Sequence, residues 1–138
     1  MSGRAFFDTN VLVYAFDQGE PNKRDGAKRL ISEYGSAGNL VLSTQVLQEF
    51  YVVTTQKLAQ PLSKEIAAEV VNELSAFPLI QIDKGLINQA MTRHREESFS
   101  FWDCLIVEAA LLSDCSLLLT EDMQNGRRID HLEIRNPF

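Results

Sequence analysis

The chain has 138 residues, of which 45% are hydrophobic and 23% charged, ordinary values for one globular domain spanning residues 1–138. Its longest apolar run, Leu105 to Leu112, contains Glu108 and is too short to cross a membrane. The net charge of −6 argues against a basic nucleic-acid-binding protein, unless clustered acids bind metal ions and so reverse the local charge.

The N-terminal residues lead directly into an apolar strand, without the charged and then apolar segments of an export signal. The two cysteines, Cys104 and Cys115, follow no disulfide pairing pattern. We therefore expect reduced thiols, a cytoplasmic protein and no association with membranes.

Apolar spacing and capping residues predict strands that alternate with helices along the chain. In chain order they are a strand at Ala5–Phe7, a helix at Val11–Phe16, a helix through Ala27–Tyr34, a strand at Leu40–Leu42, a helix capped by Ser43 or Thr44, a helix from Ser63 to Leu74, a strand at Leu79–Ile82, a helix capped by Asp83, a helix capped by Ser100, a strand at Leu117–Leu119 and a strand at Leu132–Ile134. This alternation predicts an α/β fold with a mainly parallel central sheet covered on both faces. Sites in such folds form beyond the carboxyl ends of the strands.

Four acidic residues lie beside apolar segments, where charged side chains are rare unless paired or bound to a cation: Asp8, Glu49, Asp103 and Asp122. Asp8 follows the first strand, where a helix cap is the alternative, although Thr9 and Asn10 could also cap. Glu49 lies at the edge of an apolar helical stripe, where a solvated glutamate is equally common.

Asp103 lies in a helix whose apolar residues cover nearly the whole helical wheel, so that helix is predicted to be buried. A capping box with Ser100 is the alternative for this acid. Glu108 points to another side of the wheel and is predicted to be the solvent contact of the helix. Glu121 and Asp122 both follow a strand, and the pattern alone does not select which one enters the pocket.

Carboxylate oxygens are the preferred ligands of hard cations, so these acids predict a site for Mg²⁺ or Mn²⁺. His94 and His131 lack zinc-ligand spacing, and the sequence contains no glycine-rich phosphate loop and no Gly-x-Ser-x-Gly elbow. The chemistry that remains is metal-assisted hydrolysis.

Four motifs together resemble the PIN-domain nucleases, especially the VapC-like toxins of bacterial toxin–antitoxin pairs. They are Phe6-Phe7-Asp8-Thr9-Asn10, Gln48-Glu49-Phe50, Ser100-Phe101-Trp102-Asp103 and Leu119-Thr120-Glu121-Asp122, and the resemblance covers essentially the whole chain. It implies a three-layer α/β/α sandwich that cleaves RNA with Mg²⁺ or Mn²⁺, and a homodimer held inactive by a cognate antitoxin.

The resemblance assigns the catalytic quartet to Asp8, Glu49, Asp103 and Asp122, with Thr9, Asn10, Thr120 and Glu121 in support. In that assignment Asp8, Asp103 and Asp122 hold metal, and Glu49 is a ligand or the base that orients water. The family's Thr-x-Asp pattern favours Asp122 over Glu121.

Arg127 and Arg128 are the favoured RNA-binding candidates, because they follow Asp122 closely. Taken singly, each of these arginines is more simply a solvated surface charge, as are the basic residues elsewhere, among them Lys23. The aromatic residues Phe99, Phe101 and Trp102 are assigned to the core, although they could stack on a base. The alternative function is a catalytically inactive PIN-like interaction module that binds RNA or a protein.

Overall fold

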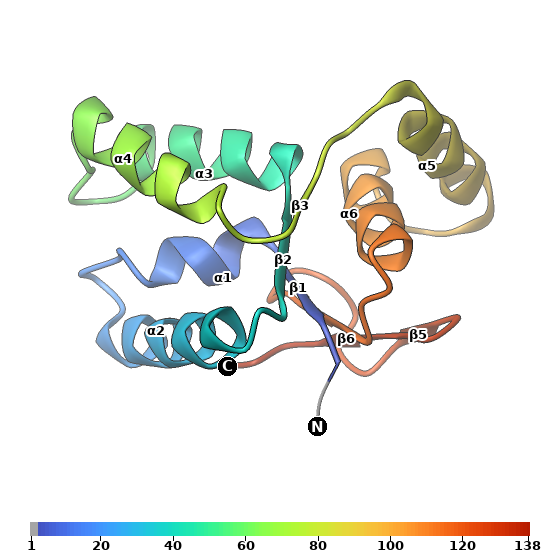
Figure 1. The fold of residues 1–138 in the computed structure, drawn as a ribbon, viewed down its shortest axis with the longest axis horizontal. Coiled ribbons are helices and arrows are strands. Elements are labelled where there is room, and N and C mark those ends of the chain that lie inside the picture. Colours follow the sequence, from blue (N-terminus) through green and yellow to red (C-terminus); the bar gives the residue numbers. More distant parts are fainter. Residues whose placement is uncertain (1–2) are drawn as a thin grey trace.

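The fold, taken from a computed structural model that describes residues 3–138, is built on a central β-sheet (Figure 1). Its strands are β1 (Ala5–Phe7), β2 (Leu40–Ser43), β3 (Leu79–Ile80), β4 (Leu117–Leu119), β5 (Arg128–Ile129) and β6 (Leu132–Arg135). Their order in the sheet is β3-β2-β1-β4-β6-β5, and every pairing is parallel except that of β5 with β6. The predicted mainly parallel sheet is confirmed.

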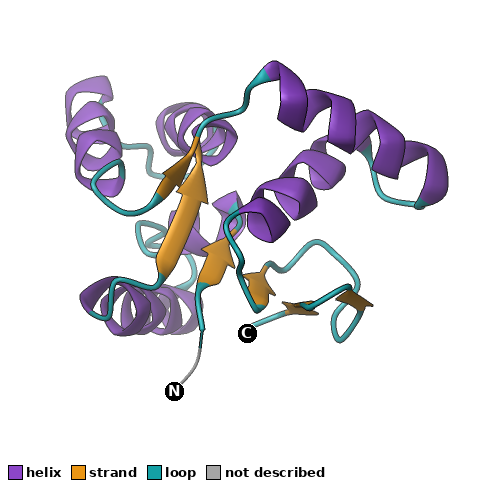
Figure 2. Cartoon of the chain, turned by 45° about the vertical axis from the view of Figure 1, so that its right-hand side comes forward, coloured by secondary structure: helices purple, strands orange, loops and turns teal. Residues whose placement is uncertain are grey.

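Helices cover both sides of the sheet, which gives the three layers that the resemblance implied (Figure 1, Figure 2). The helices are α1 (Thr9–Tyr14), α2 (Pro21–Ser36), α3 (Thr44–Gln56), α4 (Lys64–Leu74), α5 (Lys84–Glu96) and α6 (Phe101–Leu112). In Figure 1, α1 to α4 lie on one side of β1 and β2, and α5 and α6 on the other. No helix within residues 3–138 is long and apolar enough to cross a bilayer.

The sheet centre is apolar because its strands are buried on both faces, as expected for parallel strands. Ala5, Phe6 and Phe7 of β1 are fully buried, as are Leu40 to Leu42 of β2. Cys104 and Cys115 are buried and free, so neither is used in a disulfide.

Differences from the predicted elements occur where tertiary contacts decide the local structure. β3 ends at Ile80, because the Ile82 amide donates instead to the Thr44 hydroxyl over 3.1 Å. The first helix begins at Thr9, two residues earlier than predicted. β5 was not predicted, since a strand of two residues shows no alternating pattern.

The strand order reverses between β1 and β4, which are neighbours in the sheet although they are far apart in the sequence. The sheet extends from β1 to β2 and β3 on one side, and from β4 to β6 and β5 on the other. A crevice forms at such a switch point, outside the carboxyl ends of the strands. Asp8 follows β1 and Asp122 follows β4, so both lie at this point.

Candidate active site

A pocket of about 660 Å³ opens at the switch point, between the starts of α1 and α6, the middle of α3 and the loop after β4. Its lining includes all four acids that the sequence singled out: Asp8, Glu49, Asp103 and Asp122. Asp17 also lines it, and Lys57 is the basic residue among its described lining residues. The pocket therefore carries a strong excess of negative charge.

Asp8 is the N-cap of α1 and also lines the pocket, so its role as a cap does not prevent it from facing the pocket. Its Oδ1 accepts from the Thr9 amide over 2.7 Å and its Oδ2 accepts from the Thr120 hydroxyl over 2.8 Å. Capping by Thr9 or Asn10, which the sequence allowed, does not occur.

The Asp8 side chain is only 7% exposed, and this burial is the main cause that raises its pKa to about 6. The hydrogen bonds from Thr120 and Thr9 lower the pKa, whereas the charges of Glu49 and Asp103 raise it further. None of the main causes of this shift is a basic side chain. A cation in the pocket would relieve this accumulation of like charge.

Glu49 is held from two sides on the face of α3 that borders the pocket. The Thr9 hydroxyl donates to Glu49 Oε1 over 2.6 Å, and Gln45 Nε2 donates to Oε2 over 3.3 Å. Gln45 lies one helical turn before Glu49, so the pair shares a face of α3. Gln45 also donates to the Trp102 carbonyl over 3.2 Å, which ties α3 to the start of α6.

Asp103 occupies the first turn of α6, where the Ser100 hydroxyl accepts from its amide over 3.1 Å. Burial is the main cause that raises the pKa of Asp103; the Ser100 hydroxyl opposes the shift, and the charges of Asp122 and Glu49 add to it. The predicted Ser100 cap and the placement of Asp103 at the pocket therefore coexist.

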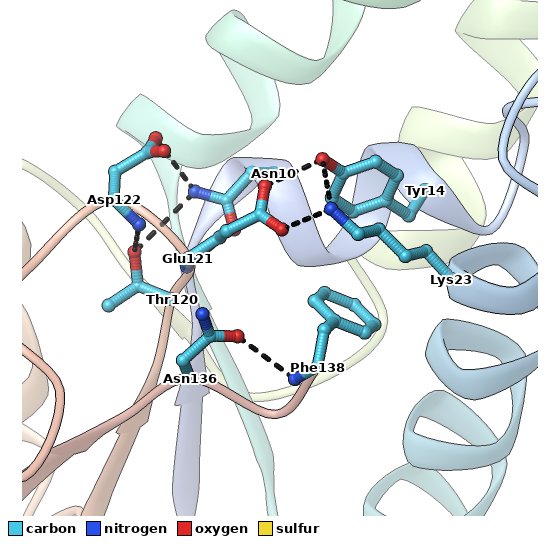
Figure 3. A network of polar contacts seen from close by, with 8 residues as sticks. All are labelled: Asn10, Tyr14, Lys23, Thr120, Glu121, Asp122, Asn136 and Phe138. Atoms are coloured by element: carbon cyan, nitrogen blue, oxygen red, sulfur yellow. Dashed lines mark hydrogen bonds and ion pairs between the residues drawn. The ribbon is translucent and has the colours of Figure 1, made fainter.

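The loop after β4 turns Asp122 toward the pocket through contacts with α1 (Figure 3). Asn10 Nδ2 donates to Asp122 Oδ2 over 2.9 Å, and Asn10 Oδ1 accepts from the Glu121 amide over 3.1 Å. The Asp122 amide donates to Thr120 Oγ1 over 3.2 Å. Thr120, whose hydroxyl reaches Asp8, thereby links the two acids.

Glu121 points away from Asp122 and is bound by residues of α1 and α2 (Figure 3). The Tyr14 hydroxyl donates to Glu121 Oε1 and Lys23 Nζ donates to Oε2, each over 2.6 Å. The hydrogen bond from Lys23 is the main cause that lowers the pKa of Glu121. Of the two consecutive acids, only Asp122 lines the pocket.

The surroundings of Trp102 and Glu108 differ from those that the sequence predicted. Trp102, assigned to the core, is 63% exposed at the pocket. Glu108, predicted to contact solvent, is 6% exposed and forms an ion pair with Arg93 of α5. Arg127 pairs with Glu97 and Arg128 with Glu133, and neither arginine lines the pocket.

The donor set of the pocket fits a hard divalent cation, since every candidate ligand is a carboxylate oxygen and charge compensation is lacking. Within residues 3–138 no three Asp, Glu, His or Cys side chains stand close enough to share one ion in the present arrangement. The carboxylates are instead directed to Thr9, Asn10 and Thr120 by the hydrogen bonds described above. Asp8, Asp103 and Asp122 nevertheless all line the same pocket.

Sequence reasoning missed three polar residues of the site. Gln45 and Tyr14 each lie four residues from a singled-out residue, Glu49 and Asn10 respectively, so the i, i+4 spacing could have indicated them. Lys23 carried no local signal, because its partner Glu121 lies 98 residues away.

A family model for the PIN domain matches residues 5–131. The chain belongs to the PIN domain family. No curated protein gives a significant sequence match.

Solved structures with the same fold include PIN domains in complexes with partners. A toxin–antitoxin complex from Klebsiella pneumoniae superimposes with a TM-score of 0.71 and 20% identity over 97% of this chain and 98% of that chain. VapC20 of Mycobacterium tuberculosis, described as a Sarcin-Ricin loop cleaving toxin, has a TM-score of 0.60 and 19% identity over 83% and 86%. VapBC2 of Rickettsia felis, bound to a promoter DNA fragment, has a TM-score of 0.60 and 17% identity over 96% and 97%. At these identities the likeness concerns the fold.

Proposed function

We propose that this PIN domain is a ribonuclease that depends on Mg²⁺ or Mn²⁺ and hydrolyses phosphodiester bonds. The observation that carries the proposal is the buried Asp8 carboxylate, whose like-charged neighbours outnumber the bases of the pocket. Such uncompensated acids destabilise the fold unless a cation joins them, and that cation would attract the phosphate of a nucleic acid.

In this proposal Asp8, Asp103 and Asp122 would hold the cation, which polarises a phosphoryl oxygen and lowers the pKa of water. Glu49 accepts a proton from the attacking water, because the hydrogen bonds from Thr9 and Gln45 fix its carboxylate at the pocket wall. The water oxygen forms a bond to phosphorus as the opposite phosphorus–oxygen bond breaks; the leaving oxygen takes up a proton from solvent, and Glu49 releases to solvent the proton that it accepted.

We further propose that the protein is the toxin of a toxin–antitoxin pair and forms a homodimer. The support is that similar folds come from toxin–antitoxin complexes, including those of Klebsiella pneumoniae and Rickettsia felis. Co-expression with the product of a neighbouring small gene, followed by size-exclusion chromatography, tests both the partner and the dimer. Migration as a lone monomer in both preparations would contradict this part of the proposal.

Cleavage of a random-sequence single-stranded RNA pool in Mg²⁺ tests the nuclease, with EDTA and Asp8→Asn as the two ways to abolish it. We expect either change to lower the rate at least about 100-fold, because both remove the binding of the cation. Asp114→Asn is the matched control, since Asp114 is exposed and lies outside the pocket lining. It should cleave at the wild-type rate.

Cleavage that survives both EDTA and Asp8→Asn would refute the metal-dependent mechanism. Binding of RNA or of a protein partner without any cleavage in Mg²⁺ or Mn²⁺ would instead favour the inactive interaction module.

A further inference from the structure

Trp102 is exposed at the start of α6, a helix whose middle is buried. Cys104 to Ala110 of α6 are all buried, yet Trp102 in its first turn is 63% exposed. A tryptophan buries more apolar area than any other residue when it enters a core, so an exposed one forgoes considerable stabilisation. A single exposed apolar side chain is common on protein surfaces, but this indole lines the acidic pocket and is therefore within reach of a ligand bound there.

The exposed indole is nevertheless held in a defined place. Its ring packs edge to face against Phe101, with 5.4 Å between the ring centroids and 71° between the planes. The Trp102 carbonyl accepts from Gln45 Nε2, and Ser100 caps the helix immediately before it. Because the residue is already restrained, a ligand that stacks on the indole loses little further conformational entropy.

The orientation of Gln45 strengthens this restraint. Its Oε1 is buried and accepts no hydrogen bond from the residues that the structure describes. The opposite orientation of the amide would direct Oε1 at the Glu49 carboxylate and the Trp102 carbonyl, and three acceptors would then repel one another. Gln45 thus connects the candidate base, Glu49, with the backbone that carries the indole.

Trp102 and Asp103 are consecutive and both line the acidic pocket. A volume of about 660 Å³ is within the range of sites that enclose a small ligand, so it can accept a nucleotide. A phosphate that meets the carboxylates through a cation brings its own or the adjacent base toward the indole. The indole offers a stacking face and one N–H donor, but no acceptor that could select among bases.

We propose that Trp102 is the stacking surface for an unpaired RNA base beside the scissile phosphate. This inference rests on the proposed ribonuclease function and narrows its substrate to RNA that is single-stranded at the cleaved position. Bases in a duplex stack on one another and do not present a free face to the protein. Stacking on an aromatic side chain tolerates every base, so Trp102 selects for an unpaired nucleotide rather than for a sequence.

Trp102 is the sole tryptophan of the chain, so tryptophan emission reports on this one position. Glu49→Gln protein in Mg²⁺ retains the three acids that would hold the ion and lacks the proposed base, which allows binding to be followed without cleavage. We expect a random-sequence twelve-nucleotide single-stranded RNA pool to quench the emission saturably. The same pool annealed to its complement should quench at least about 10-fold more weakly.

Kinetics of the active protein provide the second measurement. Trp102→Leu keeps an apolar side chain but removes the ring, and should raise KM for the single-stranded pool about 10-fold with a smaller effect on kcat. Trp102→Phe should recover most of the affinity. Leu112→Ala is the matched control, because Leu112 is also 63% exposed on α6 but lies outside the pocket lining.

Equal quenching by single-stranded and annealed RNA, or an unchanged KM in Trp102→Leu, would overturn the stacking proposal while leaving the nuclease intact. Emission that changes with protein concentration but not with RNA would also overturn it, because a second copy would then cover the indole. Wild-type protein that cleaves no RNA refutes the ribonuclease itself, whatever the fluorescence shows.

Discussion

Asp8 and Glu108 are buried to the same extent, at 7% and 6% exposure, but their surroundings differ. Glu108 forms an ion pair with Arg93, which lies on the neighbouring helix α5. Asp8 receives two hydrogen bonds from neutral groups and has the acids Glu49 and Asp103 as its charged neighbours. One acid is compensated within the protein and the other is not.

This difference separates a structural acid from a candidate functional one more clearly than burial does. A buried ion pair joins two elements and is complete without a ligand, whereas buried like charges are tolerated only where something else is to be bound. Sequence position cannot make this distinction, since both acids lie beside apolar residues. Removing the charge of Glu108 and that of Asp8 in turn tests this difference.

Among these substitutions, the largest loss of stability should come from removing the charge at position 108. Glu108→Gln leaves the partly buried Arg93 without its counter-charge, and we expect the free energy of unfolding to fall by about 2 kcal/mol. Asp8→Asn should instead raise it in EDTA, because a repelled charge is removed. Urea unfolding at pH 7 measures both changes. A loss of stability in Asp8→Asn as large as that in Glu108→Gln would show that the Asp8 charge is compensated as well.

Ionisation of Asp8 should make the free energy of unfolding depend on pH. Its pKa is raised to about 6 in the folded protein, so the folded state holds the proton more tightly than the unfolded state does. The resulting stabilisation is fully present below about pH 4 and is lost as the pH rises through about 6. A shift of this size corresponds to about 3 kcal/mol.

The measurement is the difference in unfolding free energy between wild type and Asp8→Asn, taken in EDTA from pH 4 to pH 7. Subtraction removes the parallel contribution of Asp103, whose pKa is also raised, provided that its own pKa is similar in the two proteins. A difference that does not change over this range would show that Asp8 is compensated after all.

The sequence predicted the features that depend on local pattern. The main strands, the caps Asp83 and Ser100, and the parallel sheet follow from apolar spacing and capping chemistry, and all are confirmed. The meeting of Asp8 with Asp122 at one edge follows from the topology of parallel strands.

The remaining errors concern the orientation of side chains, which depends on contacts with residues far away in the sequence. A helical wheel gives the angle of Glu108 but does not show that α5 packs there with Arg93. The same wheel placed Trp102 in the core, because it contains no information about a pocket beside the first turn of α6. Glu121 and Asp122 lie in a loop without periodicity, and Lys23 from α2, distant in the sequence, binds the one that points away from the pocket.

Lys23 neutralises the charge of Glu121 as Arg93 neutralises that of Glu108, so its removal tests a second compensated acid. Lys23→Met keeps the apolar stem and removes the charge, which frees Glu121 and loosens the loop that presents Asp122. We expect the Mg²⁺ concentration for half-maximal RNA cleavage to rise about 10-fold, as for other residues that support metal ligands.

Lys28→Met on the same helix is the control, since Lys28 is exposed. Lys23→Met/Glu121→Gln should regain part of the Mg²⁺ affinity, because the stray carboxylate is removed together with its partner. If the two single lysine variants require the same Mg²⁺ concentration, Lys23 has no positioning role.

The smallest effect distinguishes two serine caps that are equivalent in local geometry. Ser63 and Ser100 each accept from the amide three residues later over 3.1 Å, and either change to alanine should cost about 1 kcal/mol of stability. Only the Ser100 hydroxyl also lowers the pKa of Asp103. Ser100→Ala should therefore move the acidic limb of the cleavage rate to higher pH, whereas Ser63→Ala should leave it in place. Identical pH profiles would mean that the Asp103 carboxylate does not need to be ionised for cleavage, and Asp103 would then join Glu108 as a structural acid.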